Sequence, residues 1–351
     1  MSGKKAKHLL EVRDLYCSFK IHEGWVRAVS GVSFHLDTGE TIGLVGESGC
    51  GKTTTAYAIT SLLPRNASIW GGDILFKGRS LLTNVRKDGT INIFDEDIRK
   101  TRWKDISIIF QGAMDSFNPV YKVGEQMVEA IRVHEKVDYE AAKARVLKLL
   151  STVGIGHDRF SNYPHEFSGG MKQRALIAMS LALNPSIVIA DEPTTALDVV
   201  TQYNILREIK RIQSEQKVAM IVISHDVTTV AEMSDRMIVM YGGKLMEISP
   251  TLDLFQNPAH PYTMGLIDSI PSLTGDIKEM AERLASIPGS PPSLLDPPPG
   301  CVFHPRCPYA FERCDKEVPP EIEVAPKHKA ACFLADDLYN KRREDKWKKS
   351  Q

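Results

Sequence analysis

Short apolar runs recur along the first two thirds of the chain, and each run predicts a strand that is buried on both faces. These runs lie at residues 41–45, 106–110, 187–190 and 218–223. Residues 26–36 instead alternate between apolar and polar side chains, and residues 71–78 lie between turns, so both segments predict further strands. Residues 237–240 predict another strand, which ends in a glycine hairpin.

Helical patterns lie between these strands. Residues 54–63 predict a helix directly after a glycine-rich turn. Residues 123–153 turn helical, and residues 140–150 place their apolar side chains on one face, which indicates a helical insert between two strand-rich parts. Ser168 is a good N-cap residue, so residues 171–183 predict another long helix.

The glycine-rich turn at residues 46–53 (GESGCGKT) joins the first buried strand to the first helix. Strand, glycine-rich turn and helix form the context in which a phosphate-binding loop works. Glycines let the backbone N–H groups converge on an anion, and the helix N-terminus adds unpaired donors. Lys52 can neutralise phosphate charge and Thr53 can ligate Mg²⁺, so this loop predicts binding of a nucleoside triphosphate.

Polar residues at the ends of two later strands suggest the hydrolytic chemistry. Asp191 and Glu192 follow the strand at 187–190, where a sheet edge places its ligand. Asp191 is placed to hold Mg²⁺, and Glu192 to polarise a water against the terminal phosphate; a solvated acidic turn is the alternative. His225 follows the strand at 218–223, and we interpret it as a γ-phosphate sensor rather than a structural histidine. Phe19 either stacks on the base or is a core aromatic.

Composition limits the other possibilities. The 351 residues carry 44 Lys+Arg and 44 Asp+Glu, so no overall field favours nucleic acid. The longest apolar stretch, residues 175–190, is interrupted by Asn184 and Pro185, so we expect no membrane span, and the N-terminus lacks the apolar core of a secretion signal. We expect a cytosolic protein, or one peripheral to the cytosolic face of a membrane.

The last part of the chain has a different composition. Residues 249–326 are rich in proline and predict a loop-rich appendage, and residues 341–349 are basic.

Four motifs in this order resemble the ATP-binding cassette (ABC) ATPases: the phosphate loop, Gln111, the signature at residues 168–171, and the Asp191–Glu192 pair. The resemblance implies an α/β P-loop NTPase with a RecA-like core, an antiparallel β subdomain and a helical subdomain. It also implies that Gln111 touches Mg²⁺ and reports to a membrane partner, and that Asp198 contacts a second subunit. Phe19 is then the implied adenine-stacking aromatic, and Tyr16 the second choice.

The resemblance implies further that two such domains enclose two ATP molecules head to tail. The helix that Ser168 begins supplies a donor set separate from the phosphate loop. One copy does not easily cover its own loop with that set, so closure on a second subunit completes each site.

The tail is similar to that of oligopeptide/dipeptide importer ATPases. The resemblance rests on residues 162–166, 257–263, 287–289 and 300–310. It implies a complex with a second, different ATPase subunit, two permease subunits and an extracellular substrate-binding protein. Some relatives carry oligosaccharides or nickel, and a soluble ABC ATPase without a transport role is a further alternative.

Six cysteines include a group of four in the tail, namely Cys301, Cys307, Cys314 and Cys332. In a reducing compartment such a group suggests metal before disulfide, although the spacing contains no Cys-x2-Cys pair of an ordinary zinc ribbon. By resemblance to relatives we expect a [4Fe–4S] cluster, with zinc or an unliganded thiol set as alternatives.

The sequence therefore predicts an ABC nucleotide-binding domain at residues 1–250, with a helical subdomain at about 112–167, and a C-terminal domain at 251–351. Glu192, His225 and Gln111 are the predicted catalytic residues, and Thr53, Gln111 and Asp191 the predicted Mg²⁺ ligands. The predicted ATP-binding residues are Phe19, Gly46, Glu47, Ser48, Gly49, Cys50, Gly51, Lys52, Thr53 and Thr54, with Ser168, Gly169, Gly170 and Met171 contributed by the signature of a second subunit.

Overall fold

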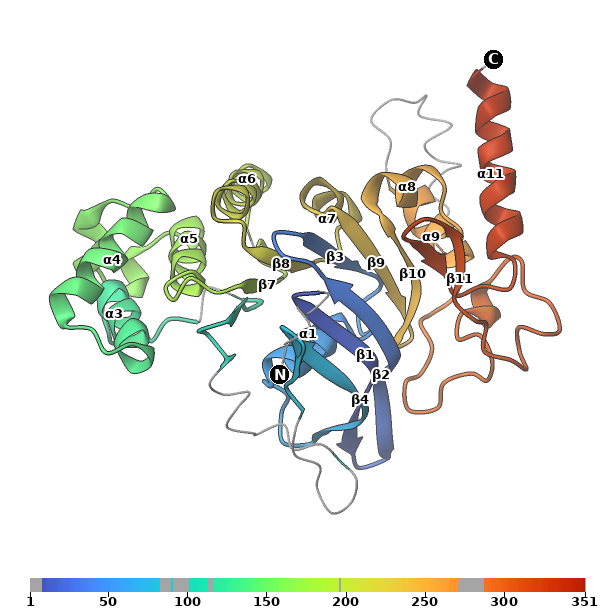
Figure 1. Cartoon of the computed structure of the whole chain (residues 1–351), viewed down its shortest axis with the longest axis horizontal. Coiled ribbons are helices and arrows are strands. Elements are labelled where there is room, and N and C mark those ends of the chain that lie inside the picture. The colour runs from blue at the N-terminus through green and yellow to red at the C-terminus, as the bar shows by residue number, and fades with distance from the viewer. Residues whose placement is uncertain are drawn as a thin grey trace, which may run out of the picture. The chain divides into compact units, whose positions relative to one another are not determined.

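The apolar runs of the sequence form strands in the computed structural model, which describes residues 8–82, 90, 101–112, 116–195, 197–270 and 287–350 (Figure 1). The chain packs as two units. One unit comprises Met1–His35, Ile42–Ile93 and Ser224–Gln351, and the other comprises Leu36–Thr41 and Phe94–Ile223.

The first unit contains an antiparallel sheet with the strand order β2-β1-β4-β5. Leu10 lies opposite Phe76 and Phe19 lies opposite Ala67, with register shifts on either side of Tyr16. Most residues of β1 and β2 alternate between buried and more exposed positions, which suits a sheet with one face on the core. The strands are β1 (Leu10–Ile21), β2 (Gly24–Leu36), β4 (Ala67–Phe76) and β5 (Arg79–Ser80).

The first unit also contains strands in the order β11-β12-β10-β9-β3. β3 runs parallel to β9, and the remaining neighbours pair antiparallel. Every residue of β3 and β9 is buried, as expected for strands covered on both faces. These strands are β3 (Thr41–Val45), β9 (Arg236–Tyr241), β10 (Lys244–Pro250), β11 (Ile322–Ala325) and β12 (His328–Ala330).

Helices of the first unit follow these strands in the chain. The helix α1 comes after β3, α8 and α9 come after β10, and α11 forms the C-terminal helix drawn in red (Figure 1). Their bounds are α1 (Lys52–Thr60), α7 (Val227–Met233), α8 (Thr251–Gln256), α9 (Pro261–Asp268) and α11 (Ala335–Ser350).

Within the first unit, a buried carboxylate of β10 forms hydrogen bonds with two segments of the tail. Glu247 of β10 is fully buried, and it accepts hydrogen bonds from the backbone N–H groups of Ala259 at 2.8 Å and His260 at 2.9 Å. His328 of β12, also fully buried, places its Nε2 2.6 Å from Glu247 Oε1. A buried carboxylate needs such partners to offset its lost hydration. The tail therefore continues the sheet that contains β3.

The second unit combines three parallel strands with helices. β6 pairs with β7 and β7 pairs with β8, and every residue of these strands is buried. Figure 1 shows α3 and α4 in green, with α5 next to them. The elements are β6 (Ile106–Ile109), β7 (Ile187–Asp191), β8 (Ala219–Ile223), α3 (Val123–His134), α4 (Tyr139–Thr152), the 3-10 turns His157–Ser161 and Pro164–Glu166, α5 (Gly169–Ser180) and α6 (Val199–Gln216).

The structure corrects several expected boundaries. The first helix begins at Lys52 and ends at Thr60, because Ser61 adopts a left-handed conformation with φ of 53°. The insert at 123–153 is two helices, since the Asp138 side chain caps a new helix by accepting from the N–H of Ala141 at 2.8 Å. The apolar face expected at 140–150 is confirmed by buried Ala142, Val146, Leu149 and Leu150.

The tail contains more structure than its proline content suggests. Ala259, Ala330, Ala335 and Tyr339 form a small buried core, against which Ile322, Val324, Ala325 and Cys332 pack. Within the part of the chain that the structure describes, no helix combines the length and hydrophobicity that a membrane crossing requires.

His260 makes the stability of this region sensitive to acid. Its buried ring caps α9, because Nδ1 accepts from the N–H of Tyr262 at 3.0 Å, and burial lowers the pKa of the ring to about 3. In the unfolded chain the imidazole of His260 takes up a proton below about pH 6.5, whereas the folded ring stays neutral. The contribution of the neutral ring to the free energy of unfolding is therefore complete above pH 6.5 and is lost as the pH falls toward 3.

We predict that the free energy of unfolding falls more steeply between pH 6 and pH 4 in the wild type than in His260→Asn. Urea unfolding followed by circular dichroism measures this free energy at each pH. The asparagine oxygen can replace the Nδ1 acceptor without titrating. The difference in slope should be about 1.4 kcal/mol per pH unit. Equal slopes in the two proteins would contradict the assignment.

Candidate active site

The phosphate loop follows β3 in the first unit and depends on its glycines. Gly46 has a φ of 148°, and a Cβ atom there would lie 2.1 Å from the carbonyl oxygen of Met240. Gly49 has a φ of 78°, but a Cβ there would meet open space. The loop is thus packed tightly against β9 at its start and is open at its middle, where an anion can approach.

Lys52 closes the loop on itself. Its Nζ donates to the carbonyl oxygens of Gly46 at 2.7 Å and of Glu47 at 3.0 Å, and the residue is 7% exposed. Cys50 lies beneath it with Sγ at 3.6 Å, and burial raises the pKa of this thiol although Lys52 opposes the rise. The ammonium group is therefore bound by two carbonyl dipoles and a sulfur atom within the loop, and none of these partners is a carboxylate.

Two threonines and His225, predicted to take part in nucleotide binding, belong to segments at or near the loop. Thr53 and Thr54 are partly exposed in the first turn of α1. The backbone N–H of Ser224 donates to the carbonyl of Leu44 in β3 at 3.5 Å, and the exposed His225 directly follows Ser224. The hydroxyl oxygen of Thr53 can ligate Mg²⁺, and the N–H groups at the start of α1 can bind phosphate oxygens.

The two candidate base-stacking residues lie on β1. Phe19 is half-buried, and Tyr16 is 46% exposed and lines a groove of about 790 Å³ with Trp25, Trp70 and Arg27. Trp25 and Trp70 pack edge to face, with ring centroids 4.8 Å apart. The assignment of Phe19 as the adenine-stacking residue remains a prediction.

In the second unit, Glu192 and Gln111 meet. Gln111 Nε2 donates to Glu192 Oε2 at 2.9 Å, and the Thr195 hydroxyl donates to the same oxygen at 2.9 Å. Glu192 has a φ of 48°, and its N–H donates to the carbonyl of Ile223 in β8 at 2.9 Å. Asp191, the last residue of β7, is fully buried. Two strands thus fix the orientation of one carboxylate between an amide and a hydroxyl group, a contact that the sequence pattern did not predict.

The signature and Asp198 begin two helices of the second unit. Ser168 is exposed and caps α5 by accepting from the N–H of Met171 at 3.3 Å, while Phe167 anchors this turn at 5% exposure. Asp198 is exposed and caps α6 by accepting from the N–H of Thr201 at 3.0 Å, and the hydrogen bonds from Thr201 lower the pKa of its carboxyl. Both residues have a structural role in their own chain, and their contacts with a second subunit remain predictions.

Sequence reasoning missed two tail residues that contact the phosphate loop. Arg306 Nη1 and Nη2 donate to the two carboxylate oxygens of Glu47 at 2.8 and 3.0 Å. The hydroxyl oxygen of Tyr262 accepts from the backbone N–H of Glu47 at 2.9 Å. In the sequence, the segment around Arg306 indicates only a family resemblance. No local pattern connects residues 259 positions apart.

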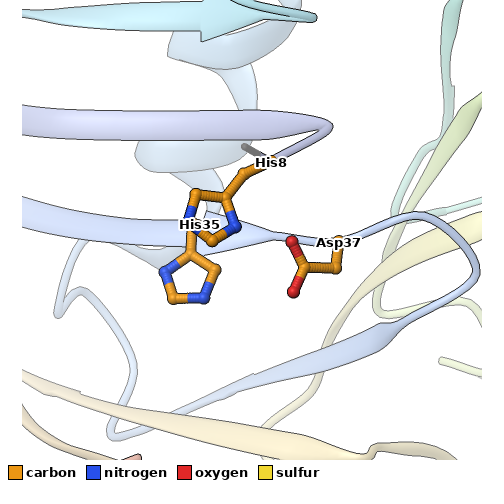
Figure 2. A group of neighbouring side chains, drawn as sticks. All are labelled: His8, His35 and Asp37. Atoms are coloured by element: carbon orange, nitrogen blue, oxygen red, sulfur yellow. The ribbon is translucent and has the colours of Figure 1, made fainter. Parts of the chain in front are cut away.

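A histidine pair lies elsewhere in the first unit. The rings of His8 and His35 have centroids 3.9 Å apart, and Figure 2 shows them with Asp37, which follows β2. Arg236 Nη1 lies 3.3 Å from His35 Nε2. A guanidinium group so close to the ring opposes a metal cation, so we assign no ion there.

Comparison with known proteins agrees with these features. The sequence pattern of the ABC transporter family matches residues 29–195, and that of the oligopeptide/dipeptide transporter C-terminal region matches residues 246–314. The dipeptide transport ATP-binding protein DppD of Bacillus subtilis is 45% identical over 331 residues, which are 93% of this chain and 95% of that protein. The oligopeptide transport ATP-binding protein OppD of Escherichia coli is 42% identical over 335 residues, 95% of each chain.

Among solved structures, a dimeric bacterial ABC transporter cassette is similar with a TM-score of 0.59 at 24% identity, over 69% of this chain and 98% of that one. This similarity concerns the fold alone. The expected P-loop NTPase fold with antiparallel and helical subdomains and a C-terminal extension is confirmed.

The expected [4Fe–4S] cluster is wrong. The similar proteins are described by ATP binding and peptide transport, and an iron–sulfur group is not part of that description. The four cysteines line a cavity of about 20 Å³ that also contains Phe303 and Phe311. A cavity of this volume has room for about one water molecule, and not for four iron and four sulfide atoms.

The chemistry of these thiols points the same way. Burial raises the pKa of Cys307 to about 11 and of Cys332 to about 12, whereas a metal ligand is a thiolate. Among the described residues, no three cysteine sulfurs lie within 4.8 Å of one another, as zinc ligands would. The cysteines pack here as small apolar side chains. Two histidines of the tail have other partners, since His304 bonds to the Cys301 carbonyl oxygen and His328 to Glu247.

We predict that Gly46→Ala destabilises the nucleotide-free protein by about 2 kcal/mol more than Gly49→Ala. Both changes put alanine at a positive φ, but only the first places a methyl group against a backbone carbonyl. Chemical denaturation of the two variants measures the difference. Equal losses of stability would show that the loop start is not tightly packed.

Proposed function

We propose, from the premise that this chain belongs to the family of ABC transporter ATP-binding proteins, that it powers an importer of oligopeptides or dipeptides. The observation that carries the proposal is the succession of two patterns in one chain, an ABC cassette followed by an oligopeptide/dipeptide transporter C-terminal region. The relatives that are named for dipeptide and oligopeptide transport match over nearly the whole chain, including this region.

The chain is an ATPase whose hydrolysis is coupled to transport. We assign the phosphates to the loop at 46–54, where the backbone N–H groups of α1 and the Lys52 ammonium group face the anion. Lys52 exchanges its bonds to the carbonyls of Gly46 and Glu47 for bonds to phosphate oxygens. Thr53, Gln111 and Asp191 would hold Mg²⁺, which supplies positive charge to the phosphate oxygens.

We assign the water-orienting role to Glu192. Hydrogen bonds from Gln111 and Thr195 to a single oxygen, Oε2, fix the plane of the Glu192 carboxylate. A carboxylate held in this way can accept a proton from a water molecule that attacks the terminal phosphate. His225 is assigned to the γ-phosphate, because the N–H of its neighbour Ser224 donates to Leu44 in the strand that leads into the loop.

A second ATP-binding subunit belongs to this proposal. Ser168 is exposed at the N-terminus of α5, with Gly169 and Gly170 partly exposed behind it, so these donors are accessible to a nucleotide from outside the chain. We propose that this partner is a homologous ATPase subunit, and that Asp198 at the start of α6 lies at the same interface. ATP then stabilises the closed pair and hydrolysis releases it.

The remaining partners are two permease subunits and an extracellular substrate-binding protein, so we place the chain at the cytosolic face of the membrane as a peripheral subunit. In the second unit, Val120 and Tyr121 are 70% and 59% exposed, shortly before α3, and Val133 is 71% exposed near its end. Exposed apolar side chains of this size support a protein contact. The balanced charge of the chain gives nucleic acid no comparable attraction.

We predict that Glu192→Gln lowers the ATP turnover of the reconstituted transporter about a hundredfold or more, because an amide cannot accept the proton of water. ATP affinity, measured by equilibrium binding, should stay within about threefold of the wild type. Peptide uptake into vesicles should cease with hydrolysis.

The matched control is Glu208→Gln, which makes the same chemical change on α6 at a residue that bonds to Arg211. It should hydrolyse ATP and transport peptide as the wild type does. Normal turnover in Glu192→Gln would refute its role, and uptake of oligosaccharide or nickel instead of peptide would refute the substrate class.

We predict that the tagged full-length chain, purified from solubilised native membranes, retains two integral membrane proteins and a second ATP-binding chain. Mass spectrometry of the purified complex identifies them. Recovery of the chain alone, with full ATPase activity, would contradict the assembly proposed here.

A further inference from the structure

The phosphate loop contains a carboxylate, Glu47, whose charge is opposite to what a triphosphate site requires. At short range, two negative groups repel each other strongly unless a cation is placed between or beside them. Lys52 donates to the backbone carbonyls of Gly46 and Glu47 and to the Cys50 sulfur, and not to this carboxylate. The compensation for Glu47 therefore comes from another part of the chain.

Arg306 supplies that compensation, and every N–H of its guanidinium group is used. Nη1 and Nη2 each donate to one oxygen of Glu47, at 2.8 and 3.0 Å. The remaining N–H groups donate to the Tyr241 hydroxyl at 3.1 Å, to the Ile287 carbonyl at 3.0 Å and to the Pro288 carbonyl at 2.8 Å. A bidentate pair of this kind is stronger and more directional than a simple contact between charges.

The burial of the pair makes it effective. The Arg306 side chain is 7% exposed and that of Glu47 is 24% exposed, so solvent screens the interaction only partly. The hydrogen bonds from Arg306 to Glu47 raise the pKa of the arginine further above its usual range. Removing one member would leave the other charge poorly compensated.

Three buried aromatic rings pack together near Arg306, and one of them, Tyr241, contacts its guanidinium group. Tyr241, Tyr262 and Phe303 are each at most 1% exposed, and their ring centroids lie 4.6 to 5.3 Å apart. Tyr262 also accepts from the backbone N–H of Glu47, so the tail fixes both the main chain and the side chain of this loop residue. All these residues belong to the first unit.

We propose that Arg306 is a positioning residue of the nucleotide site: it neutralises and orients Glu47, and through this contact the C-terminal region sets the affinity of the phosphate loop for ATP. The inference rests on the ATP-binding function proposed above. Without Arg306, the Glu47 carboxylate is uncompensated beside the bound phosphates and can turn toward them. Arg306 makes no contact with the reacting atoms, so its effect is on binding rather than on the chemical step.

The test measures MgATP affinity by equilibrium titration of the full-length protein, and KM and kcat in the reconstituted transporter. Arg306→Gln should raise the Kd for ATP about tenfold or more, equivalent to about 1.4 kcal/mol. KM should rise in parallel, and kcat at saturating ATP should stay within about twofold. Arg306→Lys keeps the charge but cannot serve both carboxylate oxygens and both carbonyls, so its Kd should be intermediate.

A charge-matched double variant separates electrostatics from folding. In Arg306→Gln combined with Glu47→Gln, no carboxylate is left uncompensated, so Kd should return to within about threefold of the Glu47→Gln single variant. Arg313→Gln is the control, because Arg313 is an exposed tail arginine paired with Glu317. It should bind ATP as the wild type does.

Wild-type affinity in Arg306→Gln would overturn the proposal, and so would a double variant as weak as Arg306→Gln alone. If Arg306→Gln does not fold, a wild-type Kd in Arg306→Lys overturns it equally. Failure of the wild type itself to bind or hydrolyse ATP would count against the proposed function instead, so the two failures are distinguishable.

Discussion

The Lys52 ammonium group and the carbonyl oxygens of Gly46 and Glu47 form the interaction on which the candidate site depends. Two hydrogen bonds of 2.7 and 3.0 Å hold the loop in a closed curve around a nearly buried cation. Dipoles satisfy this charge only partly, so it is still attracted to phosphate. The close contact of Gly46 with the Met240 carbonyl requires that the first loop position has no side chain. The loop shape is therefore set by backbone packing before any ligand binds.

The same packing explains why the tail belongs to the unit that contains the phosphate loop. β12 pairs with β10, β10 with β9, and β9 with β3, which leads into the loop. The buried Glu247 bonds the tail at two places that are far apart in sequence, the adjacent Ala259 and His260 and the later His328. Because a buried carboxylate is costly without partners, these segments depend on one another for stability. A region rich in proline can thus be well ordered when a sheet edge and a buried charge fix it.

Local patterns predicted the strands and the phosphate loop because those features depend on neighbours in sequence. Uninterrupted apolar runs gave β3, β7 and β8 to within a residue or two, and the glycine spacing located the turn before α1. Helix ends were less predictable, since Ser61 and Asp138 end or begin helices through single backbone or cap contacts. The Gln111–Glu192 bond and the Arg306–Glu47 pair join residues 81 and 259 positions apart. No periodicity encodes such contacts, because they depend on how complete elements pack.

The cysteines and Arg306 show that residue type alone does not identify which residues of the tail have a functional contact. Four thiols suggested a metal, yet they line an apolar cavity and burial raises the pKa of three of them. Arg306 directly precedes one of them and was the less conspicuous residue, yet it makes the direct contact with the nucleotide loop. A loop with a carboxylate at its second position needs a fixed cation, and its own lysine is bound to carbonyls. In the role proposed for Arg306, the C-terminal region supplies this cation and so completes the charge balance of the phosphate loop.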